Sequence, residues 1–344
     1  MNSGKVPVNV LKRSVLRQLK NKRTEIANSA GLGADCAVFA PFSEGQMVTC
    51  VQEGVVELQC ENDLAEAERE DLSVMPMRRI FQKCANNLAA AGAEPVAAEL
   101  VIFLPETVEE PELKALMEEA EKAATDLNIQ IIGGQTRVSS AVRQPIATAT
   151  GYGILSEAAV TQASAGKKLA GQDIIITKWI GLEGTADLAT RNQEKLLERY
   201  PAYLVEEAEA FDRYYSILPE AATAVKSGGC TMHDASEGGI FAGLWEMAEG
   251  AGVGLTIDMK KLPLRQETVE VCEFCNVNPY ELRSGGSLII ASPEGTAVVE
   301  ALAAEGIPAV IVGRFTDSNE RLILNEDEVR YMDRPQRDEI YKSV

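Results

Sequence analysis

The sequence predicts a mixed α and β protein with two domains, and three observations lead to this prediction. The chain has 344 residues, which is more than one hydrophobic core usually serves. Hydrophobic residues make up 46% of the chain and charged residues 25%, so both halves can bury a core. From residue 36 onward, runs with helical periodicity alternate with short apolar runs typical of strands. We place the domain boundary after residue 156, which gives domains of residues 1–156 and 157–344.

The first domain is expected to alternate strands and helices after a basic amphipathic helix at its start. Residues 75–92 carry apolar side chains at helical spacing and end on Gly92, a signal for a helix C-terminus. The continuous apolar run at 96–104 is typical of a buried strand. The expected elements, in chain order, are a helix at 8–22, strands at 36–40 and 47–52, a helix at 75–92, a strand at 96–104, a helix at 105–128, and strands at 129–134 and 144–155.

The second domain is expected to follow a stretch of small and polar residues that suits a crossing between domains. Residues 183–227 have the composition and spacing of helices almost throughout. The last twenty residues are charged, and we expect an edge strand and a tail there, with no catalytic group. The other expected elements are strands at 173–177, 252–258, 287–292 and 307–315, and helices from near 238, at 266–275 and at 294–305.

Charge and hydropathy exclude several classes of function. The net charge of −19 leaves no surplus of positive potential to attract nucleic acid, and the basic residues at 12–23 fall on one amphipathic helix. No apolar run approaches the roughly 20 residues that cross a bilayer. The N-terminus lacks the apolar core of a signal peptide. We therefore expect a cytoplasmic protein that binds neither nucleic acid nor membrane.

The cysteines do not indicate a disulfide framework. There are seven, an odd number scattered along a long chain, so we expect reduced thiols. Cys272 and Cys275 form a Cys-Glu-Phe-Cys element that is compatible with half of a zinc site or with a redox pair. A zinc site needs two more soft ligands, and the sequence has no second pair of this spacing. We favour two thiols on a helix, and keep a metal or redox protein as a third hypothesis.

The segment 232–240, Met-His-Asp-Ala-Ser-Glu-Gly-Gly-Ile, has the strongest chemical pattern. It holds the only histidine, His233, beside Asp234, and it runs into Gly238 and Gly239 where a helix is expected to begin. A polar turn with glycines at a helix N-terminus presents backbone N–H groups to an anion or a metal-bound phosphate. The segment therefore predicts an anion-binding helix start.

Three other segments have a related pattern. Asp35 follows the glycines of Gly-Leu-Gly-Ala-Asp-Cys, and Glu53 closes a predicted strand before Gly54. A third predicted strand ends in glycines followed by amide and hydroxyl groups. Oxygen ligands of this kind suit Mg²⁺, and backbone N–H groups suit phosphate oxygens. The alternative, unrelated turns at strand ends, stays open. The residues of the third segment are Gly133, Gly134, Gln135 and Thr136.

A fifth segment places Lys178 at the end of a predicted strand, with Gly181 and Gly184 at the start of a helix. A lysine there can neutralise a phosphate while the helix N-terminus donates N–H groups. The spacing is not that of a P-loop, and no dinucleotide-binding glycine motif follows a strand in this chain. A surface lysine without a ligand is an equally open interpretation.

Taken in order, these segments resemble the aminoimidazole ribonucleotide (AIR) synthase superfamily. The motifs are GLGADCAVF, VQEGVVE, CANNLAAAGAEPV, IIGGQTRV, AGQDIIITKWIGLEGTADLA and MHDASEGGIFAGLWEMAE, and they cover about residues 30–315. They are most similar to the branch that contains the hydrogenase maturation protein HypE. Thiamine monophosphate kinase and selenophosphate synthetase are more distant relatives. The spacing and order make chance similarity improbable.

The resemblance implies an α+β protein of two domains, of which the first dimerises through its sheet. It also implies ATP and Mg²⁺ in a cleft between the domains, transfer of phosphate to an oxygen, and a protein partner in maturation. By this resemblance, Asp35 and Asp234 are expected to ligate magnesium. Lys178 and the Gly181 to Gly184 loop are expected to lie near phosphate. The remaining expected sites are Gly133, Gly134, Thr136, Gly238, Gly239 and Asn87 for nucleotide, and Glu53 and Gln135 for metal.

The chain departs from the family pattern at several acids. The positions that usually hold acids read Ala34, Glu53, Asn87 and Gln135, so two acids become amides, one becomes alanine and one aspartate becomes glutamate. An amide oxygen is a weaker Mg²⁺ ligand than a carboxylate, so we expect weaker or rebuilt metal binding, to which Glu57, Glu61 and Asp63 could contribute. The resemblance to HypE also predicts a cysteine at the C-terminus, whereas the last cysteine here is Cys275.

Two hypotheses about function follow. In the first, the protein is an ATP-dependent enzyme that phosphorylates an amide, carboxylate or hydroxyl group by positioning and charge neutralisation, using Asp35, Glu53, Lys178 and Asp234. His233 then acts as a proton donor or as a hydrogen-bonding partner of Asp234, and we favour the partner role. In the second, the protein is a non-catalytic homodimer that binds a nucleotide or another ligand and serves as a regulatory or assembly factor. It rests on the amides at positions 87 and 135.

Overall fold

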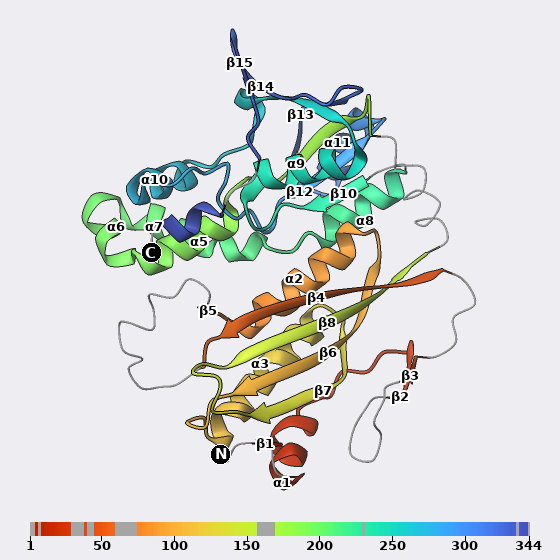
Figure 1. Ribbon diagram of the computed structural model, residues 1–344, viewed down its shortest axis with the longest axis vertical. Helices are drawn as coiled ribbons and strands as arrows, with labels where there is room; N and C mark the ends of the chain where they lie inside the picture. Colours follow the sequence, from red (N-terminus) through yellow and green to blue (C-terminus); the bar gives the residue numbers. More distant parts are fainter. Residues whose placement is uncertain are drawn as a thin grey trace. The chain divides into compact units, whose positions relative to one another are not determined.

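The computed structural model of the chain describes eight stretches of sequence and two compact units. One unit consists of Met1–Leu88 and Ala93–Glu157, and the other of Ala89–Gly92 and Ala158–Val344. Helices and sheets occur in both, which confirms the predicted mixed architecture (Figure 1). The described residues are 4–5, 8–28, 38–39, 45–58, 74–156, 169–228, 231–334 and 337–342.

The first unit is built on a six-stranded sheet in the order β1-β7-β6-β8-β4-β5. Strands β6 and β7 are parallel and are joined by helix α3, whereas β8 runs antiparallel to both β4 and β6. A separate two-stranded sheet pairs β2 with β3. The strands are β1 (Gly4–Lys5), β2 (Ile26–Asn28), β3 (Val38–Phe39), β4 (Gln46–Val56), β5 (Val74–Met75), β6 (Glu94–Leu104), β7 (Gln130–Val138) and β8 (Ile146–Leu155).

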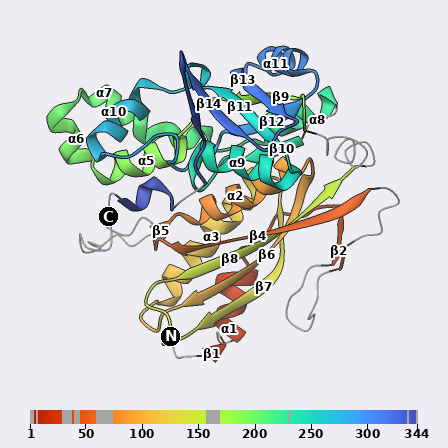
Figure 2. The same ribbon diagram turned by 45° about the horizontal axis from the view of Figure 1, so that its top comes forward.

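Helices α2 (Met77–Ala90) and α3 (Glu110–Asp126) cover one face of this sheet, as Figures 1 and 2 show. Along β8, buried residues alternate with partly exposed ones, which is the pattern of a strand with one covered face. Helix α3 begins later than the predicted residue 105, because Glu109 and Glu112 form a capping box and a proline lies in the first turn.

The N-terminal helix is shorter than predicted. A helix was expected over residues 8–22, but the structure has a three-residue helix α1 (Val8–Val10) followed by a π-helical segment η1 (Leu11–Leu16). Beyond it, the backbone is held by side chains of the unit: the N–H groups of Lys20 and Asn21 donate to the carboxylate of Glu121. This tertiary contact competes with continuation of the helix.

The second unit is built on a seven-stranded sheet in the order β10-β12-β9-β13-β11-β14-β15. The predicted helical character of residues 183–227 is confirmed. The strands are β9 (Asp173–Thr177), β10 (Thr231–Asp234), β11 (Gly254–Asp258), β12 (Leu288–Ser292), β13 (Ala309–Thr316), β14 (Arg321–Asn325) and β15 (Glu328–Tyr331). The helices are α5 (Leu182–Arg191), α6 (Gln193–Arg199), α7 (Ala202–Glu209), η3 (Ala210–Tyr214), α8 (Leu218–Ser227), α9 (Gly239–Ala251), η4 (Met259–Lys261), α10 (Gln266–Cys275), α11 (Gly295–Ala304) and η5 (Glu339–Lys342).

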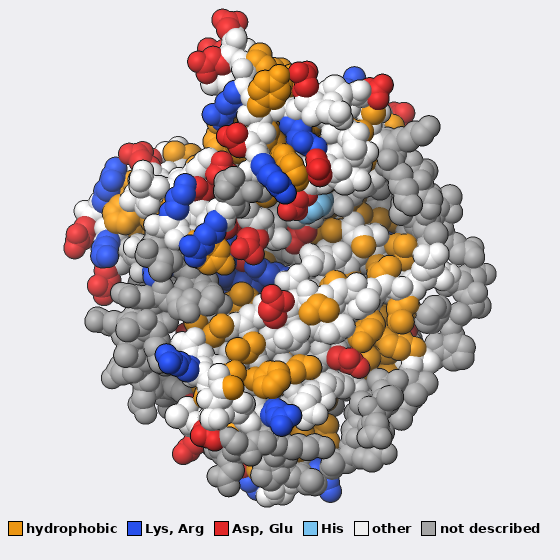
Figure 3. Space-filling view, viewed as in Figure 1, with side chains coloured by type: hydrophobic (Ala, Val, Ile, Leu, Met, Phe, Trp, Pro, Cys, Tyr) orange, Lys and Arg blue, Asp and Glu red, His pale blue; other side chains and the backbone are white. Residues whose placement is uncertain are grey.

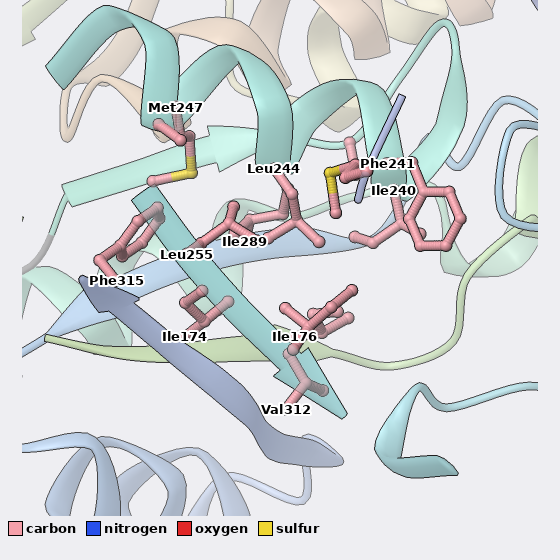
Figure 4. Packing of buried hydrophobic residues seen from close by; sticks show 14 of the residues in the cluster. Ile174, Ile176, Ile240, Phe241, Leu244, Met247, Leu255, Ile289, Val312 and Phe315 are labelled. Atoms are coloured by element: carbon pink, nitrogen blue, oxygen red, sulfur yellow. The ribbon is translucent and has the colours of Figure 1, made fainter. Parts of the chain in front are cut away.

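The central strands of this sheet are buried on both faces, which explains their continuous apolar sequences. Ile174 and Ile176 of β9 pack in one cluster with residues of α9, including Leu244 (Figure 4). Ile175 points to the other face and packs with residues of α8 and α11, including Val298. The sheet is therefore a layer between helices, and packing on both faces fixes the positions of its strands.

The end of the chain is only partly as predicted. The expected edge strand is confirmed in β15, whose residues are all exposed. The expected tail is instead docked on the second unit: Asp338 and Glu339 are each 2% exposed and Ile340 is fully buried. The apolar side chain of Ile340 and the backbone hydrogen bond from Glu339 N to Glu281 O, at 3.3 Å, hold it there.

Candidate functional site

One end of the seven-stranded sheet gathers the chemically important residues of the second unit. Strand β9 ends at Thr177 and β10 ends at Asp234, while the antiparallel strand β12 between them begins at Leu288. Asp234 is the register partner of Leu288, whose N–H donates to Thr177 Oγ1 at 3.1 Å. Lys178 and Asp234, which are 56 positions apart in the sequence, therefore lie at the same end of the sheet.

Two glycine turns lead from this end into helices. Gly181 precedes α5 with φ of 73°, Gly238 precedes α9 with φ of 78°, and Gly239, with φ of 68°, is the first residue of α9. A Cβ atom on Gly239 would lie 2.6 Å from the carbonyl oxygen of Leu282 and 2.7 Å from that of Tyr280. Only glycine fits there, because both its backbone conformation and its contacts exclude a side chain.

The two turns converge on one segment, residues 282–284. Gly181 N donates to Ser284 Oγ at 2.8 Å, and Gly184 N donates to Arg283 O at 3.0 Å. Ser284 N in turn donates to Ser236 O at 3.0 Å. This segment was not among the predicted site residues. Its signal resembles that of the other segments: two glycines between two serines, Ser284 to Ser287, directly before an apolar strand.

The start of α9 already holds a carboxylate of the chain itself. Gly238 N donates to Asp338 Oδ2 at 2.6 Å, and Gly239 N donates to Ser236 O at 3.2 Å. Burial raises the pKa of Asp338, although hydrogen bonds from backbone N–H groups and the charge of Arg283 oppose the rise. The N–H group of Gly238 thus binds a carboxyl group from the C-terminal segment, in which no catalytic group was expected.

Lys178 is held by partners within its own unit. Its ammonium group lies 2.6 Å from Glu220 Oε1 and donates to the carbonyl oxygens of Tyr214 at 2.8 Å and Ser216 at 2.6 Å. The lysine is 7% exposed, and burial lowers its pKa, while the charges of Glu220 and Asp234 oppose the change. The alternative of a surface lysine is wrong, because Lys178 is a buried cation with three acceptors.

His233 and Asp234 point to different surroundings. His233 Nδ1 donates to the backbone oxygen of Asp234 at 2.8 Å, and His233 Nε2 lies 3.3 Å from Glu246 Oε2 on α9. The favoured role of His233 as a hydrogen-bonding partner of Asp234 is therefore seen at the backbone and not at the carboxylate. Asp234 itself is 6% exposed at the end of β10, beside the buried charge of Lys178.

A buried arginine balances the acids near the glycine turns. Arg283 is 5% exposed, and its Nη1 lies 3.8 Å from Asp187 Oδ2. Glu183 and Asp338 also act on it electrostatically. This end of the sheet is thus a network of buried charges, Lys178 with Glu220 and Asp234 and Arg283 with three acids, of the kind that is found at functional sites and also in structural ion-pair networks.

Glu53 and Gln135, two of the predicted metal ligands of the first unit, do not meet in one chain. Glu53 lies within β4 and not at its end, and Gln135 lies within β7, so both strand-end predictions are wrong. Their register places them in one row across four strands, through Thr148 of β8 and Val101 of β6. Three strand spacings separate them by about 14 Å. Ligands of one Mg²⁺ ion lie about 2.1 Å from it, so these two side chains do not share an ion within one chain.

The glycines of β7 lie in the sheet, where Gly134 allows close approach of the neighbouring strand. Gly133 and Gly134 were expected to end a strand and Thr136 to follow it, but all three lie inside β7. The pairing of β7 with β6 shifts register between Ala98 and Glu99, and Gly134 beside this irregularity has φ of 139°. A side chain on Gly134 would overlap the carbonyl group of Leu100. The need for glycine here follows from close backbone approach in an irregular strand pair.

The remaining predicted residues of the first unit lie on different elements or outside the described residues. Asn87 lies on α2, the helix on the covered face, whereas Glu53 is exposed on a strand of the sheet. Asp35 and the glycines at 31 and 33 lie outside the described residues, as do Glu61 and Asp63. Glu57 is exposed just after β4.

Two further predictions concern metals and thiols. Within the described residues, no group of three or more histidine, cysteine, aspartate or glutamate side chains is arranged to hold a metal ion. Burial raises the pKa of Cys272 to about 12 and also raises the pKa of Cys275. Burial therefore disfavours the thiolate form that a nucleophile or a metal ligand needs. The hypothesis of a metal or redox protein centred on these two residues gains no support.

The comparisons with known proteins agree with this fold. Residues 78–155 match the family model described as AIR synthase related protein, N-terminal domain, and residues 170–325 match the model of its C-terminal domain. The chain belongs to the AIR synthase-related family. Among curated relatives, it is 29% identical over 236 residues to carbamoyl dehydratase HypE of Rhodobacter capsulatus, covering 67% of this chain and 66% of that protein. It is 26% identical over 206 residues to a putative hydrogenase expression/formation protein of Methanocaldococcus jannaschii, covering 60% and 58%. The chain thus spans somewhat less than two thirds of these relatives.

Solved structures with the same fold extend over nearly the whole chain. This AIR synthase-related protein superposes with a TM-score of 0.72 on the hydrogenase maturation protein HypE in complex with ATP, at 17% identity, covering 96% of this chain and 95% of that one. It superposes with a TM-score of 0.65 on thiamine-monophosphate kinase from Stenotrophomonas maltophilia K279a, at 18% identity, covering 94% and 98%. At sequence identities this low, the structural similarity establishes the fold alone.

Proposed function

We propose that this AIR synthase-related protein is an ATP-dependent enzyme that transfers a phosphoryl group to an oxygen of a small molecule or of a protein group. The observation that carries the proposal is the convergence of Asp234, Lys178 and two glycine turns at one end of the second sheet. Two solved proteins of the same fold support it: one is HypE bound to ATP and another is bound to AMPPCP and TMP. The name carbamoyl dehydratase among the relatives makes activation of an amide oxygen one form of this chemistry.

In this proposal, Asp234 is the metal-binding carboxylate of the second unit. Magnesium sites of phosphoryl-transfer enzymes commonly take one or two protein carboxylates, with phosphate oxygens and water as the other ligands. One buried carboxylate beside a glycine turn fits such a site. Asp35, the other magnesium ligand expected from the sequence, lies outside the described residues. When bound, the metal would neutralise the charge of the phosphates.

Lys178 then acts as a positioning residue. Its ammonium group binds the carbonyl oxygens of Tyr214 and Ser216 and the carboxylate of Glu220 on α8. The charge of Asp234 acts on Lys178 as well and raises its pKa, against the effect of burial. A direct bond from Lys178 to phosphate, as the sequence suggested, would first have to replace the ion pair with Glu220. His233 sits one residue from Asp234 and fixes its backbone carbonyl.

Calorimetric titration with ATP, with and without Mg²⁺, tests the proposal. Wild type is expected to bind ATP in a magnesium-dependent manner, and Asp234→Asn is expected to weaken binding by about tenfold or more, equal to about 1.4 kcal/mol. Asp173→Asn is the matched control, because this aspartate lies at the other end of β9 and pairs with Arg314 at 2.8 Å. Equal affinity without metal and in Asp234→Asn would exclude the proposed metal site.

The alternative is a non-catalytic protein that binds a nucleotide or another ligand. Two observations favour it: Glu53 and Gln135 do not share an ion within one chain, and Gly238 N is occupied by Asp338. Release of phosphate or ADP from ATP by the purified protein, in the presence of candidate acceptors, distinguishes the two. ATP binding without turnover of any kind, for wild type and Asp234→Asn alike, supports the alternative.

We also propose a homodimer formed through the first sheet. The face opposite α2 and α3 exposes apolar side chains, including Met47 at 46%, Val51 at 53% and Phe103 at 38%, and Figure 3 shows apolar groups on this face. Apolar patches of this kind mark association surfaces. Light scattering should show a dimer for wild type and a monomer for Val51→Asp. Val269→Asp, an exposed apolar position on α10, is the control and should stay dimeric.

A partner protein and the cellular location complete the proposal. A solved complex of HypE with HypF has the same fold in one component, at a TM-score of 0.65 and 20% identity, which supports the hypothesis of a protein partner in maturation. In the described part of the chain, no helix has the length and hydropathy needed to cross a membrane. The cytoplasmic location and the absence of nucleic-acid binding stay predictions.

A further inference from the structure

Two cysteines of the first unit lie in direct contact. Cys50 is on β4 and Cys84 is on α2, and their sulfur atoms are 3.4 Å apart. Cys50 Sγ also lies 3.3 Å from Cys84 O. The two residues are 34 positions apart in the sequence, so the fold and not a local motif brings them together. Both are free thiols in the structure.

The sheet makes room for this pair. Gly151 on β8 is the register partner of Cys50, and a Cβ atom at position 151 would overlap the Cys84 sulfur and lie 3.5 Å from the Cys50 sulfur. A glycine in the middle of a strand costs stability unless close packing requires it. Here the space above Gly151 is filled by the two sulfur atoms and by the side chain of Leu88. The contact is therefore part of the packing between α2 and the sheet.

The two thiols differ in exposure. Cys84 is 1% exposed, whereas Cys50 is partly exposed to solvent on β4. The hydrogen bond between them lowers the pKa of Cys50, and the same hydrogen bond, with burial, raises the pKa of Cys84. Cys50 is therefore the thiol that a small oxidant is expected to reach first, and the Cys84 sulfur lies in contact with the Cys50 sulfur.

We propose that Cys50 and Cys84 form an oxidant-sensitive dithiol, which a hydroperoxide converts into an intrachain disulfide between β4 and α2. The sulfur atoms need to approach by about 1.4 Å to reach bonding distance. This site is separate from the proposed ATP chemistry. It lies three residues before Glu53 on one element and three before Asn87 on the other.

The chemistry balances with hydrogen peroxide as the oxidant. The Cys50 thiolate attacks one peroxide oxygen, the O–O bond breaks, and the leaving hydroxide takes a proton to become water. Cys50 is now a sulfenic acid. The Cys84 sulfur attacks the Cys50 sulfur, the S–S bond forms, the S–O bond breaks, and the departing oxygen takes the Cys84 proton as water. Two thiols lose two electrons and two protons, and one peroxide becomes two waters.

Mass spectrometry of the full-length protein after peroxide treatment tests the proposal. Wild type should lose two of its seven titratable thiols, and a peptide map should show Cys50 linked to Cys84. Dithiothreitol should restore both thiols. Cys50→Ser should abolish the link, while Cys272→Ser, which removes a buried thiol of the second unit, should leave its rate unchanged.

A further variant tests the geometry without removing a thiol. Gly151→Ala displaces the Cys84 sulfur and should slow the cross-link by about tenfold or more. The wild-type peptide map decides the question even if this variant does not fold. If peroxide converts Cys50 to a sulfinic acid while Cys84 stays free, or if Cys50 links to another cysteine, the proposal is wrong. A Gly151→Ala variant that folds and cross-links at the wild-type rate would also contradict it.

Discussion

Replacement of Lys178 by methionine should destabilise the protein strongly, because it removes one partner from a buried ion pair. Methionine keeps most of the volume of the side chain but has no charge and no donor. Glu220, which is 3% exposed, would keep its charge and lose the cation 2.6 Å away. The carbonyl groups of Tyr214 and Ser216 would lose a donor as well. The substitution therefore separates the structural role of Lys178 from a role as a phosphate ligand.

The magnitude follows from these contacts. Breaking a buried ion pair by removing one partner costs about 3–5 kcal/mol, since the remaining charge is left buried and uncompensated. Hydrogen bonds to a charged group contribute about 1.5–3 kcal/mol each, but part of that is already in the ion-pair figure. We expect Lys178→Met to lower the free energy of unfolding by about 4 kcal/mol. Neutralising the partner should recover part of the loss, so Lys178→Met with Glu220→Gln should cost about 2 kcal/mol.

Urea unfolding followed by circular dichroism measures these differences. Lys195→Met is the control, because Lys195 is exposed on α6 and its loss should change stability by less than about 0.5 kcal/mol. The reasoning is refuted if Lys178→Met is as stable as wild type, or if the double variant is less stable than the single one. A stable Lys178→Met protein with weakened ATP binding would instead return Lys178 to the role of a phosphate ligand.

Three further predictions concern other parts of the structure. Burial raises the pKa of Asp338 in the folded state, so its contribution to the free energy of unfolding falls as the pH rises from the unfolded pKa of about 3.9 through the folded pKa. Asp338→Asn should lack this pH dependence in urea unfolding measured across that range. If the free energy of unfolding changes with pH in the same way for wild type and variant, the prediction is wrong. Gly239→Ala should lower the free energy of unfolding by at least about 2 kcal/mol, since φ is 68° and two carbonyl oxygens block a Cβ atom. Gly250→Ala in the same helix is the control; it has open space around the Cβ position and should be neutral or stabilising. Equal effects of the two substitutions would refute this prediction. The oxidised Cys50–Cys84 form should resist urea by up to about 4 kcal/mol more than the reduced form, because the bond closes a loop of about 35 residues, and a loss of stability on oxidation would show that the bond strains the sheet.

Local sequence patterns were sufficient for most elements. The apolar run at 173–177 and the amphipathic helices of 183–227 follow from periodicity, which depends only on neighbouring residues. The motif order from 30 to 315 was sufficient for the family. Element ends were less predictable where tertiary contacts decide them. The predicted helix at 8–22 stops early because backbone N–H groups after it bind Glu121, which is about a hundred residues away.

The candidate site shows the same division. Its glycines and acids were visible in the sequence, because φ preferences and ligand chemistry belong to individual residues. Their partners were not visible: Lys178 binds Glu220, and Gly238 binds Asp338, across 42 and 100 positions. Strand register decided that Glu53 and Gln135 lie apart, and helix packing decided that Cys50 meets Cys84. The sequence by itself determined most of the secondary structure, the family and the chemical groups, since these depend mainly on local patterns. Only the tertiary structure decided which groups meet, because hydrogen bonds and ion pairs form between segments that the chain order leaves far apart.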